Sequence, residues 1–469
     1  MMALKCANLH LLRKLFAYMG VDRSIAYTLA GRGWGLLSGV VTLLLVVRFL
    51  TSDEQGYYYT FASLLAMQIL FELGMSYVVM QFSSHEMAHL SWANDGTIVG
   101  DVQAKTRLRS LLLLVTKWYG VIAALIIVVI LPIGWMFFSV NRPQSTVNWQ
   151  AAWIWLVIAA ATNIFFLPLL SLLEGCGRII EVARLRMYQN IIGSLAAWVT
   201  LVSGRGLLAV PAMSTGLAFT VLIWLWCTKK TFLKNLFAHK ADTSVGIRWK
   251  TEIWPFQWKI ALSWLSGYFI FQLFVPVLFA YRGAVEAGQM GMSFSIVTAL
   301  MSLAMAWMST KAPQFGTLVA RKDYVRLDQL FNSTLSCSFF VMSVLGVTLC
   351  IVNYLLHVEN IRVASRFLDP LPFTLLMLAT ILNYVTYAQS AYLRAHKQEP
   401  FLRISLISAG LIAVSTFGLG EEYGAMGIMS GYFVVGATVG FGWGSLIFLS
   451  KRHEWQKSCA LEVSGKGTL

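Results

Sequence analysis

SLLLLVTKWYGVIAALIIVVILPIGWMFFS, residues 110–139, contains a single charged side chain, Lys117. About 20 consecutive apolar residues are enough for a helix to cross the hydrocarbon core of a bilayer. We therefore predict that this stretch spans a membrane. Similar runs recur along the whole chain, in which 58% of the residues are hydrophobic and 12% are charged. Together with a mean hydropathy of +0.68, this pattern excludes an ordinary soluble domain.

Eleven further runs of the same kind lie on either side of this stretch, so we predict twelve membrane-spanning helices. Even a buried core helix does not need an apolar run of this length. The predicted spans are residues 25–50, 57–80, 110–139, 150–173, 187–204, 207–228, 260–281, 287–310, 332–357, 372–393, 403–420 and 424–450.

The basic residues divide the connections between these spans into two groups. Residues at the end of a span, such as Arg48 and Arg403, are counted with the adjoining loop. Of the 36 Lys and Arg residues, 28 then lie at the two termini and in the even-numbered loops, six lie in the odd-numbered loops, and Arg32 and Lys117 lie within spans. Short loops rich in Lys and Arg stay in the cytoplasm. We therefore predict a multi-pass protein of the cell inner membrane, with both termini cytoplasmic and residues 358–371 external.

The net charge of +15 does not indicate a nucleic-acid partner, because the basic residues adjoin spans, where anionic headgroups attract them. We predict membrane lipids as partners and no nucleic acid. The six cysteines form no CxxC pair, and the chain contains no GxSxG, no P-loop and no DxD motif. The sequence therefore predicts neither a cofactor nor a catalytic centre.

Short motifs occur twice in the chain, and the two Glu-x-Gly triplets are 232 residues apart. Six spans in each half is an even number, so both halves enter the membrane from the same side, as in parallel repeats. The paired motifs are Arg48 with Arg282, Glu54-Gln55-Gly56 with Glu286-Ala287-Gly288, and Gln81-Phe82 with Gln314-Phe315.

The predicted fold class is therefore an all-α polytopic membrane protein, with twelve transmembrane helices in two parallel six-helix lobes. The segment between the halves is rich in Lys, Phe and Trp, which is typical of a helix on the membrane surface. We predict three parts: an N-terminal lobe at 1–228, an amphipathic cytoplasmic connector at 229–259 and a C-terminal lobe at 260–469.

The sequence His85-Glu86-Met87-Ala88-His89 is a literal HExxH, a motif that holds catalytic zinc when both histidines share a helix face. A catalytic zinc needs a third protein ligand, and no residue in the sequence is a convincing candidate. We predict no metal here and interpret the motif as a helix end at the membrane interface.

Three ionisable residues lie inside the first three predicted spans: Arg32, Glu72 and Lys117. Counted from the cytoplasmic ends at 1.5 Å per residue, all three are about 10–12 Å deep. Charges at that depth need partners or a wet cavity. Two interpretations stay open: an Arg32–Glu72 ion pair with Lys117 extended to the interface, or a cationic patch that binds an anionic headgroup. Trp34, close to Arg32, is a further candidate for contact with sugar.

The second half lacks a comparable set of charges within its spans. Its intramembrane polar residues are uncharged, so we expect electrostatic recognition in the first half. These residues are Gln272, Asn332, Asn353, Asn383 and Gln389.

Motifs near the N-terminus resemble those of bacterial polysaccharide transporters, the flippases that move lipid-linked O-antigen or capsule repeat units. The resemblance lies in an Arg that ends span 1, an acidic-x-Gly-Tyr turn, and an acidic-apolar-Gly-apolar segment in span 2. The matching residues are Val47-Arg48-Phe49-Leu50, Glu54-Gln55-Gly56-Tyr57-Tyr58 and Glu72-Leu73-Gly74-Met75. Glu286-Ala287-Gly288-Gln289-Met290-Gly291-Met292 is similar to the counterpart in the second half.

The resemblance implies a superfamily fold shared with multidrug exporters and peptidoglycan-precursor flippases, and movement of a polyprenyl-pyrophosphate-linked oligosaccharide to the outer leaflet. The resemblance implies no catalytic residues. Arg48 and Glu72 occupy positions of the polysaccharide-transporter motifs. The expected candidate partners are a glycan polymerase and a chain-length regulator, and H⁺ or Na⁺ is a candidate coupling ion. Two rival functions stay open: a multidrug exporter on the same fold, and a membrane enzyme acting on lipid-linked glycan.

Overall fold

The computed structural model describes residues 23–141, 146–238, 249, 254–396 and 400–465, which form helices joined by short turns and one β-hairpin. The part of the connector at 239–253 lies outside the described residues, apart from Trp249. Contacts divide the chain into two compact units. Unit 1 consists of residues 1–50, 67–139 and 144–262, and unit 2 of residues 51–66, 140–143 and 263–469.

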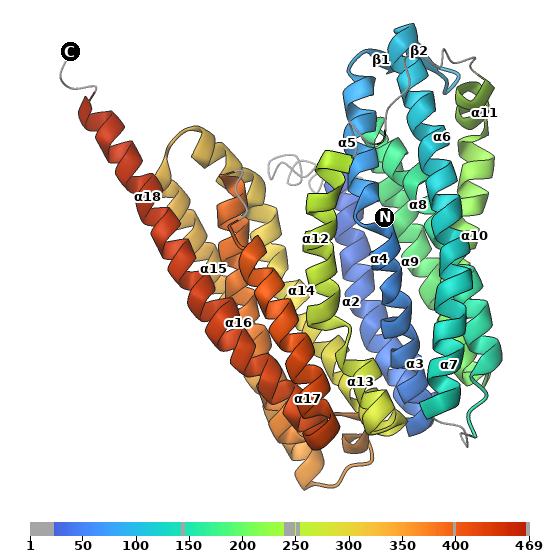
Figure 1. Cartoon of the computed structure of the whole chain (residues 1–469), viewed down its shortest axis with the longest axis vertical. Coiled ribbons are helices and arrows are strands. Elements are labelled where there is room, and N and C mark those ends of the chain that lie inside the picture. Colours follow the sequence, from blue (N-terminus) through green and yellow to red (C-terminus); the bar gives the residue numbers. More distant parts are fainter. Residues whose placement is uncertain (1–22, 142–145, 239–248, 250–253, 397–399, 466–469) are drawn as a thin grey trace, which may run out of the picture. The chain divides into compact units, whose positions relative to one another are not determined.

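In unit 1, α9 packs against α2 and α10, while α8 packs against α5, α6 and α10. Figure 1 shows the β1–β2 hairpin at one end, where it joins α5 to α6. The elements of unit 1 are α2 (Arg23–Phe49), α4 (Ile69–Glu72), α5 (Met75–Met87), β1 (Leu90–Trp92), β2 (Ile98–Gly100), α6 (Val102–Leu125), the π-helix η2 (Ile126–Ile130), α7 (Leu131–Asn141), α8 (Gln150–Gly175), α9 (Ile179–Val202), η3 (Gly206–Leu208), α10 (Ala209–Thr228) and α11 (Lys230–Ala238).

In unit 2, α14 lies against α3, α13, α15 and α16, and α17 packs against α13 and α16. The unit boundary divides α12 (Trp254–Phe271) and the short 3₁₀ helix η1 (Ala66–Gln68). The other elements of unit 2 are α3 (Ser52–Leu65), α13 (Phe274–Tyr281), α14 (Ala284–Ala320), α15 (Tyr324–Val358), η6 (Ala364–Arg366), α16 (Pro370–Ala395), α17 (Leu402–Val435), the π-helix η7 (Gly436–Trp443) and α18 (Gly444–Gly465).

Each of the twelve predicted spans falls on helical residues. Seven of the described helical segments are long and apolar enough to cross a membrane, or eight when the bent pair Ser52–Glu72 and Met75–Met87 counts as one span. The seven are Val102–Asn141, Gln150–Gly175, Gly206–Thr228, Ala284–Val319, Tyr324–Val358, Pro370–Ala395 and Leu402–Trp455. The chain is thus an integral membrane protein.

Two spans break where the sequence predicts regular helix. Leu73 and Gly74 both have positive φ, at 52° and 68°, and they separate α4 from α5 with a bend of 44°. Span 260–281 breaks at Gln272 and Leu273, between α12 and α13. The kink in α17 at Gly424, with φ 59° and ψ −140°, lies next to the loop predicted between the last two spans and separates two helical segments.

The repeated Glu-x-Gly triplets pack against each other in unit 2. A Cβ on Gly56 would lie 2.0 Å from the Ala284 carbonyl oxygen, and one on Gly288 would lie 2.9 Å from the Gly56 nitrogen. The Gln55 amide donates to the carbonyl oxygens of Gly288 (2.9 Å) and Arg366 (3.1 Å). Small residues at both positions allow the backbones of α3 and α14 to approach closely, which is how helices associate in lipid.

Candidate functional site

Glu72 lies at the break in the second span. Its Oε1 atom accepts a hydrogen bond from the Ser76 hydroxyl (2.6 Å), and the Tyr119 hydroxyl lies 3.4 Å from the same oxygen. Ser76 and Tyr119 are also 3.0 Å apart. α4, α5 and α6 therefore bring one carboxyl group and two hydroxyl groups together inside unit 1. Ser76 follows Glu72 by four residues across the bend, and Tyr119 reaches the same oxygen from α6.

Lys117 does not join this cluster. It precedes Tyr119 by two residues, which places the two side chains about 200° apart around α6. Accordingly, Tyr119 is buried and Lys117 is exposed. Arg48 is also exposed, in the last turn of α2, with its guanidinium over the Phe49 ring. The side chain of Arg32 lies outside the described residues, so the predicted Arg32–Glu72 pair stays a prediction.

Trp34 contributes to the contact between α2 and α9. Its indole N–H donates to the Ser194 hydroxyl (3.1 Å), and its ring lies 6.0 Å from that of Trp198. Trp198 in turn donates to Thr42 on α2 (2.8 Å). Two tryptophans thus satisfy their polar groups across one helix pair, and the predicted sugar contact of Trp34 is untested.

The HExxH residues lie where a helix ends. α5 stops at Met87, so His89 is outside the helix and does not share a helical face with His85. Glu86 binds Arg107 of α6 at 2.8 Å. Across the described part of the chain, no three His, Cys, Asp or Glu side chains are grouped closely enough to hold a metal ion. The predicted absence of zinc stays a prediction, which metal analysis of the purified protein would test.

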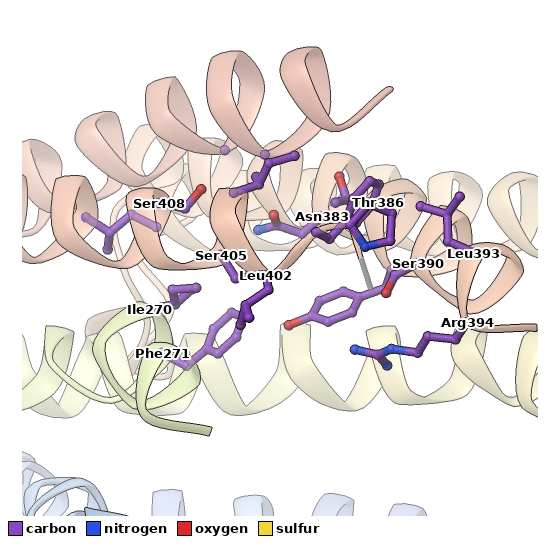
Figure 2. A pocket seen from close by; sticks show the side chains of 17 residues that line it. Ile270, Phe271, Asn383, Thr386, Ser390, Leu393, Arg394, Leu402, Ser405 and Ser408 are labelled. Atoms are coloured by element: carbon purple, nitrogen blue, oxygen red, sulfur yellow. The ribbon is translucent and has the colours of Figure 1, made fainter. Parts of the chain in front are cut away.

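A cavity in unit 2 lies between α16 and α17, and we call it the α16–α17 pocket. It encloses about 810 Å³, including its open mouth. Figure 2 shows Asn383, Thr386, Ser390 and Arg394 along one helix, with Ser405 and Ser408 on another. The lining residues are Ile270, Phe271, Asn383, Thr386, Tyr387, Ser390, Leu393, Arg394, Pro400, Phe401, Leu402, Ile404, Ser405, Ser408, Ile412, Gly436 and Gly440.

Two glycines of a π-helix line this pocket. The π-helix η7 contributes Gly436 and Gly440, and a Cβ at either position would come within 3.9 Å and 3.7 Å of the Asn383 Oδ1 atom. The Asn383 amide is held in place by donating to the Tyr432 hydroxyl (2.8 Å). π-Helical turns in α-helical proteins often mark functional sites.

Sequence reasoning identified Asn383 as an intramembrane polar residue but missed the pocket. The signal was available: Asn383, Thr386, Tyr387, Ser390 and Arg394 recur at the three- and four-residue spacing of one helix face. The contribution of η7 could not be predicted, because hydropathy does not distinguish a π-helix from an α-helix. Ser76 and Tyr119 were not predicted. The four-residue spacing of Glu72 and Ser76 was a usable signal, whereas the contact with Tyr119 depends on how α6 packs.

The chain matches no protein-family model and no curated protein in sequence. Its fold is nevertheless similar to solved transporters. An inward-facing MATE-family multidrug resistance transporter of the MOP superfamily is 14% identical, with a TM-score of 0.57, over 88% of this chain and 99% of that one. The Vibrio cholerae MATE transporter VcmN in its bent form is 13% identical, with a TM-score of 0.54, over 92% and 97%.

The lipid II flippase MurJ in an inward closed conformation is also similar, with 13% identity and a TM-score of 0.54, over 91% of this chain and 87% of that one. At these identities the likeness concerns the fold. The protein therefore has the all-α, two-lobed architecture of twelve membrane helices found in these transporters, which confirms the predicted fold class.

Proposed function

We propose that this protein flips a polyprenyl-pyrophosphate-linked oligosaccharide from the cytoplasmic to the outer leaflet of the inner membrane, for the synthesis of a cell-surface polysaccharide such as O-antigen or capsule. It does so without enzymatic activity. The lipid tail stays in the bilayer while the polar head crosses through the protein. A polar path is required, because each unpaired polar group costs several kcal/mol in hydrocarbon.

The observation that carries this proposal is the charge of the α16–α17 pocket. Among its lining residues, Arg394 is charged and none is Asp or Glu. The guanidinium fork suits phosphate and carboxylate groups. A pocket for cationic drugs would require acidic groups, so the lining supports an anionic cargo. The fold shared with a lipid II flippase supports the same conclusion.

The test is complementation of a strain that lacks its own lipid-linked oligosaccharide flippase, with surface glycan and protein abundance measured together. We expect restored export. Multidrug resistance without glycan export would favour an exporter instead. Turnover of lipid-linked glycan by the purified protein would favour an enzyme.

In unit 1 we propose that Arg32 and Lys117 contact the pyrophosphate and that Glu72 takes part in H⁺ or Na⁺ coupling. Arg32→Ala and Lys117→Ala should each lower export at normal protein abundance. Glu72→Gln keeps an oxygen that can accept the Ser76 and Tyr119 hydrogen bonds and removes the charge. It should therefore uncouple transport from the ion gradient more than it lowers abundance. Normal export by both cation variants would make these charges structural.

A further inference from the structure

We infer that the α16–α17 pocket is a glycan-recognition site, which binds the hydroxyl groups of a sugar along α16 and an oxyanion at Arg394. This inference rests on the proposed function and names the part of the substrate that the pocket receives. The sequence motifs do not identify these residues as a site.

The polar wall is a continuous track on one helix. Asn383, Tyr387, Ser390 and Arg394 follow one another by three or four residues, so they lie on the same face of α16. Eleven residues at 1.5 Å each give a track of about 16 Å. A track of neutral hydrogen-bonding groups that ends in one cation suits an elongated, hydroxyl-rich molecule with one anionic end.

A buried hydroxyl in this pocket lacks a hydrogen-bond partner. Ser408 is only 6% exposed, and among the described residues nothing bonds to its Oγ atom. Several buried hydroxyls among the described residues donate to the carbonyl four residues earlier, as Thr380 does to Leu376 at 2.7 Å, whereas Thr416, like Ser408, has no recorded partner. Leaving such a group unsatisfied costs about 1–3 kcal/mol. A hydroxyl or ring oxygen of a bound sugar would satisfy it.

The opposite side of the pocket is apolar. Phe271, near the end of α12, and Phe401, just before α17, contribute aromatic rings. Figure 2 shows Ile270 and Phe271 lying across from Ser405. A sugar ring has an apolar face as well as hydroxyl edges, so a pocket with one aromatic side and one polar side suits it.

The cation lies at one end of this track. Arg394 belongs to the last turn of α16, at the end predicted to face the cytoplasm. An oxyanion at this position has two sources: the pyrophosphate of the lipid carrier, or the carboxylate of an acidic sugar. Both bind a guanidinium in the same bidentate way.

Two substitutions test the pocket with little risk to folding. Ser408→Ala removes a hydroxyl that has no partner, so the free protein should be as stable as wild type or more so. Gly440→Ala adds a methyl group 3.7 Å from Asn383 Oδ1, an ordinary contact distance, and takes space from the ligand. Gly410→Ala on α17 is the matched control, because a Cβ there meets nothing within 4 Å.

The experiment measures binding to purified protein and export in the complemented strain. The probes are farnesyl pyrophosphate, methyl glucuronide and methyl glucoside. Ser408→Ala should weaken binding of both sugars about threefold to tenfold, the worth of one hydrogen bond. Gly440→Ala should also weaken sugar binding, whereas Gly410→Ala should bind as wild type does.

Arg394→Gln distinguishes the two oxyanion sources. Selective loss of farnesyl pyrophosphate binding assigns Arg394 to the lipid carrier, and selective loss of methyl glucuronide binding assigns it to an acidic sugar. Thermal unfolding of each variant identifies loss of fold. The inference is overturned if wild type exports glycan and Ser408→Ala and Gly440→Ala bind and export as it does. Failure of wild type to export any glycan would instead reject the proposed function.

Discussion

At the scale of single residues, the motifs that resemble polysaccharide transporters have structural roles here. Glu54 completes a capping box with Thr51, whose backbone N–H it accepts at 2.8 Å. Its counterpart in the second half, Glu286, accepts the Ala425 N–H at 2.6 Å, directly after the kink at Gly424. Both carboxylates thus satisfy an amide at the start of a helical segment. The sequence revealed the motif but not this role, because one of the two partners is 139 residues away.

Replacing Gly56 with Ala should destabilise the protein by about 1–3 kcal/mol or more, because the new methyl group would overlap the Ala284 carbonyl of α14. Gly39→Ala is the matched control, since a Cβ there meets nothing within 4 Å, and it should be neutral or slightly stabilising. Thermal unfolding in detergent measures both. Equal unfolding temperatures for the two variants would contradict the packing of α3 on α14.

Metal analysis of the purified protein should find no stoichiometric zinc. Glu86, which would have to activate a zinc-bound water, is paired with Arg107, and His85 and His89 do not share a helical face. The control is His85→Ala, which should leave the metal content unchanged. One zinc per chain that disappears in this variant would reverse the interpretation of the motif.

At the scale of helices, hydropathy predicted where the spans lie but not where they break. The twelve spans all fall on helices, because about 20 apolar residues in lipid must satisfy their backbone groups internally. The break at Leu73 was not predictable, because leucine rarely adopts a positive φ. Such a backbone conformation depends on the packing around it. In the Glu72–Ser76–Tyr119 cluster, the four-residue spacing of Glu72 and Ser76 was visible in the sequence, whereas the contact with Tyr119 depends on how α6 packs.

Acidification should weaken the packing of α15, α16 and α18. The His396 ring, just after α16, stacks on Trp455 of α18 at 3.7 Å and lies parallel to Tyr324 at 5.9 Å. Burial lowers the pKa of His396 below its usual value. The unfolded chain therefore binds a proton more readily, so this stability is present above about pH 6.5 and is lost as the pH falls below it.

Thermal unfolding measures this effect. Between about pH 7.5 and about pH 5.5, the unfolding temperature of wild type should fall further than that of His396→Phe, which keeps the stack and cannot titrate. Parallel curves for the two proteins would mean that stacking on Trp455 stabilises the imidazolium as well as the neutral ring.

At the scale of the whole molecule, the charge pattern predicts that even-numbered loops lie at one end of the helices and odd-numbered loops at the other. Contacts within each unit follow this division. In unit 1, three even-numbered loops meet. Arg178 lies over the Trp92 ring at 4.3 Å, and Lys229 pairs with Glu181 at 2.5 Å and lies over Trp92 at 5.6 Å. In unit 2, residues beside odd-numbered loops meet: the Arg366 guanidinium donates to Gln55 at 3.2 Å, and Arg282 donates to the Glu422 carbonyl.

These contacts confirm which loops share an end of the bundle, and they leave open which end faces the cytoplasm. The charge bias supplies that orientation, because short loops rich in Lys and Arg are retained inside. Single cysteines in a background without the six native ones provide the measurement. Asn94→Cys in the β1–β2 turn and Glu359→Cys after α15 are both at exposed positions. The predicted topology places them on opposite sides of the membrane.

A membrane-impermeant maleimide should label Glu359→Cys in intact cells, and Asn94→Cys only after the membrane is opened. The direction of transport depends on this result. Arg394 of the α16–α17 pocket lies at the end of α16 remote from residue 359, so it is at the cytoplasmic end of the pocket only in this orientation. A carrier that loads newly made glycan must have its binding site accessible from the compartment where the glycan is assembled. The reverse labelling would place Arg394 at the external end of the pocket and contradict loading of the glycan from the cytoplasm.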